Sequence, residues 1–378
     1  MNRKPATQTL IFLVLFSLAI AGCNMPVVTP PGQASATEAA TVYVPPAATA
    51  IPATSTPLPE PEPISNSNAS LLKVVNIAPA TNVTSLTWAS DSSSLGLVSQ
   101  NVDDSGNAVY TATVLDGRLN IKSLMASTNG DQFVRVSPDG HDVAAISSDG
   151  GTFTEYDLAD GNKAVVMISP QYRIYGVTFS PDGKTFSLTN GDTMSVDLYT
   201  LSQSSDPYPL TGFTTAAPVF DAGFAGNANT LVWHARGTIQ LQDIASKAMG
   251  ASFSHEDFVT AFTLSADGKV LASASAKTIN GDYKPAVILW DAASGSELKT
   301  LVLENPATSL SFSPDGSLLA AATGNDVQIW DTASGTLITT LTGHSGAVNL
   351  AAFSPDGRSL VSVGGDNQLM LWEILPAQ

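Results

Sequence analysis

The chain has 378 residues, a formal net charge of −17 and a single cysteine, Cys23. Because an acidic protein repels the phosphates of nucleic acids, we expect no nucleic-acid partner. One cysteine excludes an intramolecular disulfide and any zinc site built from CxxC pairs.

Residues 1–22 are typical of a signal for export. "MNRK" is basic, and the apolar stretch that follows is shorter than the roughly 20 residues of a membrane-spanning helix, which favours a cleaved signal. The small residues directly before Cys23 resemble the lipobox of bacterial lipoproteins. This resemblance implies a lipid on Cys23 and a protein held at the extracytoplasmic face of the cell membrane. The alternative is an ordinary signal peptide followed by an incidental cysteine.

Residues 23–69 have the composition of a tether. Ten of the 23 prolines lie between residues 24 and 69, among Thr, Ala and Ser and without any Lys or Arg. Such a segment cannot bury a core and is expected to be extended and disordered. Its predicted role is to hold the following domain away from the membrane.

Residues 70–378 contain seven repeats, whose equivalent positions lie 40 to 48 residues apart. Repetition at this period is typical of propellers and solenoids. The anchor positions of the repeats are Trp88, Val136, Phe179, Phe224, Leu264, Phe312 and Phe353.

Each repeat is predicted to be a four-stranded antiparallel meander. "SPDG" places Pro, Asp and Gly where a tight hairpin turn requires them, and the apolar stretches on either side predict strands. Turns such as "GGDNQ" and "DTASG" introduce the third and fourth strands. Helical periodicity is not sustained anywhere in these repeats.

The repeats resemble the WD-repeat family of β-propellers over essentially all of residues 70–378. The resemblance implies an all-β fold of seven four-stranded blades, and a buried hydrogen-bonded tetrad of His, Ser, Asp and Trp in some of them. The residues at the tetrad positions are His344, Ser362, Asp366 and Trp372 in the last repeat, and His255, Ser273 and Trp290 in the fifth, where Asp282 is the candidate fourth member.

The last repeat ends before its fourth strand. "SLLKVVN" (residues 70–76) is an apolar stretch left over before the first repeat begins. Propellers of the resembled family are often closed by a strand from the other end of the chain. We therefore predict that residues 70–76 complete the seventh blade, which would also pair an otherwise open sheet edge.

The first strand of each repeat lines the channel of a propeller, and these strands contain only Arg135 and Asp221 as charged residues. General acid-base chemistry needs a convergent set of such groups. We therefore expect no catalytic residue, no cofactor and no metal. His141 and His234 are interpreted as structural or solvated, and two weak motifs, "DGKT" (182–185) and "NVDDSGN" (101–107), as hairpin turns rather than phosphate or calcium sites.

Loops on one face of the propeller carry the residues that interfaces favour as anchors. This candidate binding face consists of Tyr172, Arg173, Phe213, Phe258 and Tyr283. The sequence thus predicts a monomeric propeller that acts as a non-catalytic scaffold for a protein or peptide. One alternative is a propeller enzyme or carbohydrate-binding protein with a loop-borne site, and another is a structural envelope component that assembles through its acidic rim.

Overall fold

The computed structural model describes residues 41–43, 60–127, 131–147, 150–159, 161, 163–166, 174–190, 194–200, 209–214, 219, 221–225, 229–235 and 237–376. The chain divides into two units, residues 1–37 and 38–378, and all described residues lie in the second. Within the described residues, no helix is long and apolar enough to cross a membrane.

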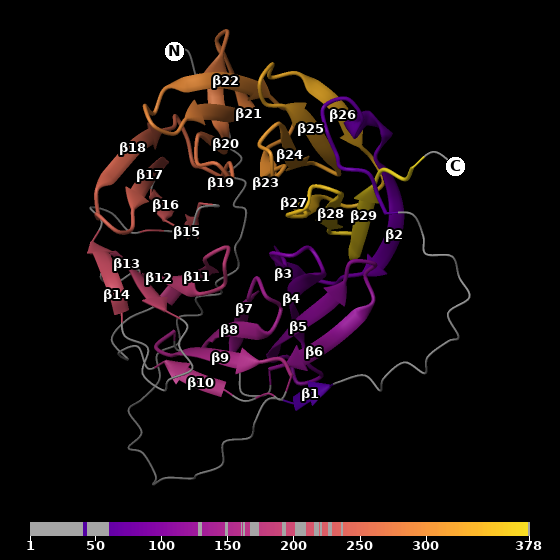
Figure 1. Ribbon diagram of the computed structural model, residues 1–378, viewed down its shortest axis with the longest axis vertical. Helices are drawn as coiled ribbons and strands as arrows, with labels where there is room; N and C mark the ends of the chain where they lie inside the picture. Colours follow the sequence, from indigo (N-terminus) through magenta and orange to yellow (C-terminus); the bar gives the residue numbers. More distant parts are fainter. Residues whose placement is uncertain are drawn as a thin grey trace, which may run out of the picture. The chain divides into compact units, whose positions relative to one another are not determined.

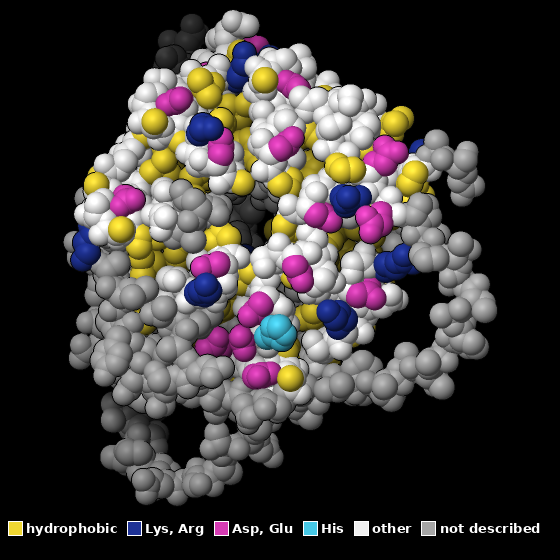
Figure 2. Space-filling view, in the orientation of Figure 1, with side chains coloured by type: hydrophobic (Ala, Val, Ile, Leu, Met, Phe, Trp, Pro, Cys, Tyr) yellow, Lys and Arg dark blue, Asp and Glu magenta, His cyan; other side chains and the backbone are white. Residues whose placement is uncertain are grey.

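Seven antiparallel sheets stand around a central hollow (Figures 1 and 2). In each sheet, strands that follow one another in the sequence are also neighbours in space, from an inner strand at the hollow to an outer strand at the rim. This arrangement confirms the predicted seven-bladed β-propeller.

The blades differ in the lengths of their strands, which are longest in the middle hairpins of blades 1 and 5. Blades 1 to 4 comprise β3 (Val83–Trp88), β4 (Ser94–Val102), β5 (Ala108–Asp116) and β6 (Ile121–Ala126); β7 (Gln132–Val136), β8 (Asp142–Ile146), β9 (Phe153–Asp157) and β10 (Lys163–Val166); β11 (Ile174–Phe179), β12 (Thr185–Asn190), β13 (Ser195–Thr200) and β14 (Pro209–Thr214); and β15 (Asp221–Phe224), β16 (Thr230–Ala235), β17 (Thr238–Asp243) and β18 (Met249–Ser254). Blades 5 to 7 comprise β19 (Ala261–Leu264), β20 (Val270–Ile279), β21 (Asp282–Asp291) and β22 (Glu297–Val302); β23 (Ala307–Phe312), β24 (Leu318–Thr323), β25 (Asp326–Asp331) and β26 (Leu337–Leu341); and β27 (Val348–Phe353), β28 (Ser359–Gly364), β29 (Gln368–Glu373) and β2 (Lys73–Pro79).

The "SPDG" sequence makes the hairpin turn between the first two strands of a blade. In blade 6 the Ser313 hydroxyl donates to Asp315 Oδ1 at 2.6 Å and accepts from the Leu318 amide at 2.9 Å. Gly316, with φ of +71°, takes the left-handed conformation that glycine adopts without steric cost. The side chains of the motif therefore satisfy the polar groups of the turn, which explains why it recurs from blade to blade.

The ring is closed by strand β2, which pairs antiparallel with β29 so that Val74 lies opposite Trp372. The predicted closure of the last blade by an N-terminal strand is thus confirmed. The strand runs from Lys73 to Pro79 rather than over residues 70–76, because a short 3₁₀ helix, η1 (Ala69–Leu71), precedes it.

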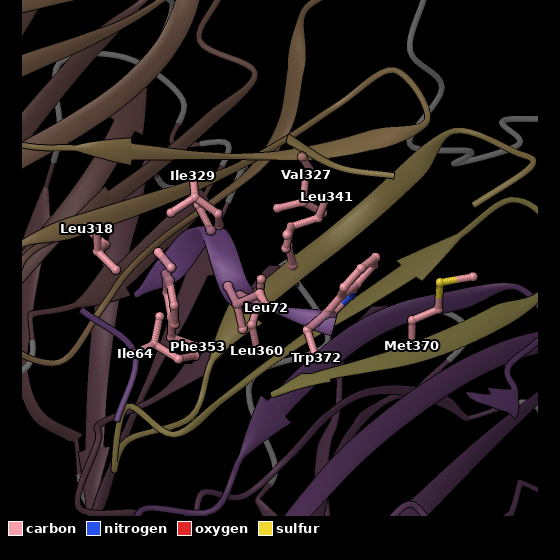
Figure 3. Packing of buried hydrophobic residues seen from close by; sticks show 14 of the residues in the cluster. Ile64, Leu72, Leu318, Val327, Ile329, Leu341, Phe353, Leu360, Met370 and Trp372 are labelled. Carbon is pink, nitrogen blue, oxygen red and sulfur yellow. The ribbon is translucent and has the colours of Figure 1, made fainter. Parts of the chain in front are cut away.

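Residues 60–72, called the strap here, pack on blades 6 and 7. The Glu62 amide donates to the Ile374 carbonyl at 2.9 Å, and the Ile64 amide donates to the Gly357 carbonyl at 2.8 Å. Ile64, Ala69 and Leu72 are buried in a cluster that unites apolar side chains of β24 to β29 (Figure 3). Ile64 and Ala69, which precede the domain boundary expected at Ser70, thus pack together with Leu72 against blades 6 and 7.

A second part of the expected tether also joins the propeller. Strand β1 (Thr41–Tyr43) pairs with the outer strand β6 of blade 1, with Val42 opposite Met125. The remainder of the expected tether and the expected signal segment, residues 1–40 and 44–59, lie outside the described residues.

Hydroxyl groups join the inner strands of neighbouring blades. Thr260 Oγ1 of blade 5 donates to the Ala307 carbonyl of blade 6 at 2.7 Å, and Thr308 Oγ1 donates to the Val348 carbonyl of blade 7 at the same distance. Since each hydroxyl satisfies a carbonyl of the next blade, these bonds add a polar seam to the apolar contacts between blades.

Candidate functional site

The last blade contains a continuous chain of hydrogen bonds through its buried side chains. Trp372 Nε1 donates to Ser362 Oγ at 2.8 Å, Ser362 Oγ donates to His344 Nε2 at 2.8 Å, and His344 Nδ1 donates to Asp366 Oδ1 at 3.0 Å. Burial opposes ionisation of Asp366, but hydrogen bonds from His344 and Ser345 outweigh it and hold the pKa of that carboxyl below its usual range. Each of these four side chains has a hydrogen-bond partner within the blade, so their role is structural.

The fifth blade has the same series of hydrogen bonds from Trp to Ser to His, but the last acceptor is different. Trp290 Nε1 donates to Ser273 Oγ at 2.8 Å, and Ser273 Oγ donates to His255 Nε2 at 2.7 Å. The carbonyl of Gly237 in blade 4, and not Asp282, accepts from His255 Nδ1 at 3.0 Å. The assignment of Asp282 is wrong because the long hairpin carries it away to its tip.

The sixth blade lacks this series of hydrogen bonds. Its buried Trp330 has no hydrogen-bond partner for Nε1. By register, Ala321 of β24 takes the place that Ser362 has in β28. Trp290, Trp330 and Trp372 therefore occupy equivalent positions in blades 5, 6 and 7, and Trp330 differs from the other two in lacking the hydrogen bond to a serine.

Arg135, on the inner strand of blade 2, forms hydrogen bonds with both neighbouring blades. Its Nε donates to the Val177 carbonyl at 3.0 Å, and one of its terminal nitrogens donates to Ser85 Oγ at 3.3 Å. Arg135 thus ties together the inner strands of blades 1, 2 and 3. Asp221 is the first residue of β15 and pairs with His234, and its side chain lies outside the described part of the chain.

The two weak motifs form turns. Asp103 Oδ1 accepts from the Ser105 and Asn107 amides at 2.9 and 2.8 Å, so this carboxylate caps its own hairpin. In residues 182–185, Asp182 Oδ1 accepts from Ser180 Oγ at 2.6 Å within the hairpin between β11 and β12. Among the described residues, no group of three or more His, Cys, Asp or Glu side chains is placed to hold a metal ion.

Blade 2 contains carboxylates whose titration is displaced by their surroundings. Burial, together with the charges of Asp139 and Asp157, raises the pKa of Asp142 to about 6. Burial and the charges of Asp142 and Asp139 raise the pKa of Glu155 to about 7. These groups neighbour one another on β8 and β9 and make the stability of the propeller dependent on pH near neutrality.

Of the candidate binding face, the structure describes the side chains that belong to blade 5. Tyr172 and Arg173 lie outside the described residues. Phe213, expected in a loop, belongs to the outer strand β14, where it pairs with Val196, and its side chain is not described. Phe258 and Tyr283 are exposed to 72% and 56% of their surface; Phe258 lies in the loop before β19, and Tyr283 lies near the tip of the hairpin β20–β21.

His255 and its partners hold the loop that carries Phe258. The His255 amide also donates to the Gly237 carbonyl at 3.0 Å, so two hydrogen bonds fix the loop to blade 4. A Cβ at Gly237 would lie 3.1 Å from the Asp257 carbonyl oxygen, which shows how closely the two segments pack. The buried histidine thereby positions the exposed residues that follow it.

The long hairpin β20–β21 is held against the same loop and against the rim. The Thr278 amide donates to Glu256 Oε2 at 3.0 Å, and Lys277 Nζ contacts Glu297 Oε2 at 2.5 Å and Thr300 Oγ1 at 3.2 Å on strand β22. The hairpin is therefore tied both to the loop before Phe258 and to the outer strand of its own blade. Sequence reasoning noticed the extra length of this hairpin but not the ion pair that ties it to β22.

Comparisons with known proteins agree with this architecture. Residues 295–331 and 335–373 match the family described as "WD domain, G-beta repeat". A WD repeat-containing protein of Synechocystis is 32% identical over 44% of this chain and 46% of its own length. WD repeat and SOCS box-containing protein 1 of Xenopus tropicalis is 28% identical over 56% of this chain and 52% of its own. The chain thus spans about half the length of these curated relatives.

A solved structure shows the same fold across nearly the whole chain. A chain in the crystal structure of the mitotic checkpoint complex superimposes with a TM-score of 0.64 at 16% sequence identity, and the match covers 88% of this chain and 99% of that one. Each of the two matched repeats begins near the outer strand of one blade and ends with the third strand of the next. The protein is therefore a seven-bladed β-propeller in which residues 295–331 and 335–373 match WD repeats.

Proposed function

We propose that this protein is a non-catalytic scaffold that binds a protein or peptide on the blade 5 surface around Phe258 and Tyr283. The supporting observation is that both aromatic side chains are exposed although hydrogen bonds hold in place the loop that carries Phe258 and the hairpin that carries Tyr283. Aromatic side chains on a pre-organised surface are favoured anchors for a partner, because little ordering is lost on binding. WD-repeat propellers generally act as protein-interaction scaffolds, which supports the same function.

Affinity capture with two variants tests this function. The bait is the full chain with Cys23→Ala, which removes the candidate lipid site. A double variant, Phe258→Ala with Tyr283→Ala, should lose the recovered partner, whereas Val102→Ala should keep it. Val102 is a matched control, since it is exposed to 72% on the other long hairpin, that of blade 1. Equal recovery by all three baits would overturn the proposed surface.

The proposal includes a location at the extracytoplasmic face of the membrane, supported by the basic start, the short apolar stretch and the lipobox-like residues before Cys23. A diacylated glycerol on this residue would supply the more than one chain that stable anchoring requires. Cys23→Ala should move the protein from the membrane fraction to the soluble fraction and abolish incorporation of labelled fatty acid. Retention in the membrane without label would refute lipid anchoring.

A further inference from the structure

Two carboxylates lie beside the exposed aromatic residues of blade 5. Glu256 and Asp257 directly precede Phe258, and Asp257 also interacts with the phenol of Tyr283. Partial burial and this hydrogen bond, together with the charges of Asp257 and Glu256, raise the pKa of Tyr283 to about 12. The Tyr283 ring is therefore held next to the carboxylates with its phenol un-ionised at neutral pH.

The positive charges near this surface already have partners. Lys277 is paired with Glu297 at 2.5 Å, and Lys284 is paired with Asp282 at 3.5 Å. Hydrogen bonds from Thr278 hold the pKa of Glu256 below its usual range, so this carboxyl is ionised at neutral pH. The surface consequently presents negative charge beside two exposed aromatic side chains.

We propose that Phe258, Tyr283 and the Glu256–Asp257 pair form one site that binds a cationic side chain, arginine or lysine, of the partner. The inference rests on the proposed function and specifies the chemistry of its partner. A cation is attracted both by the negative face of an aromatic ring and by a carboxylate, and the guanidinium group suits the two interactions together. Because hydrogen bonds fix the loop of Phe258 and the hairpin of Tyr283, little ordering is needed when the cation arrives.

A pair of labelled peptides probes the site directly. One hexapeptide carries three arginines separated by glycines, and the other carries citrulline at the same places, which keeps the shape of the side chain and removes its charge. Fluorescence anisotropy with the full-length Cys23→Ala chain measures binding at low ionic strength. The arginine peptide should bind at least about tenfold more tightly than the citrulline peptide, since charge drives the interaction.

Variants separate this site from the general attraction of an acidic protein. Phe258→Ala and Tyr283→Ala should each weaken binding of the arginine peptide about two- to fivefold, the usual range for an exposed cation–π contact. Glu256→Gln should weaken it as well, and Asp104→Asn should not. Asp104 is the matched control because it removes one charge from the exposed hairpin of blade 1.

Two results would overturn the inference: equal binding of the two peptides, or equal loss from Glu256→Gln and Asp104→Asn. Thermal melting of each variant verifies that it remains folded. Failure here is distinct from failure of the proposed function. A partner captured in a manner dependent on Phe258 and Tyr283, but insensitive to Glu256→Gln, would keep the scaffold and reject the cationic ligand.

Discussion

The strap gives the sharpest test of how the propeller is held together. Only 5% of the Ile64 surface is exposed to solvent, and its side chain lies against Phe353 between blades 6 and 7 (Figure 3). Ile64→Ala removes three buried carbon atoms and leaves a cavity in this cluster. Substitutions of this kind cost about 2–5 kcal/mol, and we expect about 2–3 kcal/mol because a rim segment can partly relax.

The assay is thermal unfolding followed by circular dichroism. A loss of this size should lower the melting temperature by about 3–5 °C for a domain of this length, because the entropy of unfolding grows with the number of residues. Leu71→Ala is the matched control, since Leu71 lies in the same segment but is exposed to 57% and should change stability by less than about 0.5 kcal/mol. Equal melting temperatures for Ile64→Ala and Leu71→Ala would show that the strap does not contribute to the core.

The remaining predictions concern the tryptophan pair and pH. Trp372→Phe should destabilise the propeller by about 1–3 kcal/mol more than Trp330→Phe, because it alone breaks a buried hydrogen bond, to Ser362; chemical denaturation measures the difference, and equal losses would contradict the argument. Since the pKa of folded Glu155 is raised to about 7, the folded state binds the proton more tightly than the unfolded state. The melting temperature should therefore fall as the pH rises from about 4.5 to 7. Glu155→Gln should flatten this fall, and Glu304→Gln should not, because Glu304 is exposed between β22 and β23. A profile unchanged by Glu155→Gln would refute the assignment of the pH dependence to Glu155.

Much of the fold could be predicted because its determinants are local. The turn at Ser313, Asp315 and Gly316 is specified by a few adjacent residues, and its recurrence predicts the number of blades. The hydrogen-bonded chain from Trp372 to Asp366 was expected from the residues that carry the family resemblance. In both cases the residues that determine the outcome belong to a single repeat.

The features that sequence reasoning missed depend on distant partners. The proline-rich composition before Ser70 favours an extended chain, and nothing in it reveals that Ile64 meets residues almost 300 positions later. Likewise, Gly237 supplies its carbonyl to His255 from another blade, and a backbone oxygen has no signature in the sequence. The attachment of the blade 5 hairpin to β22 depends on the pairing of Lys277 with Glu297, two residues that no motif connects.

The central claim is that the pairing of β2 with β29 closes the ring of the propeller, and a cross-link between these two strands tests it most directly. Lys73 of β2 lies opposite Glu373 of β29, and Gln368 lies at the other end of the same strand pair. In the Cys23→Ala chain, the Lys73→Cys, Glu373→Cys variant should form an intramolecular disulfide, detected by mass spectrometry of the linked peptides, whereas Lys73→Cys, Gln368→Cys should stay reduced. No cross-link in the first variant, or equal cross-linking in both, would contradict the closed ring.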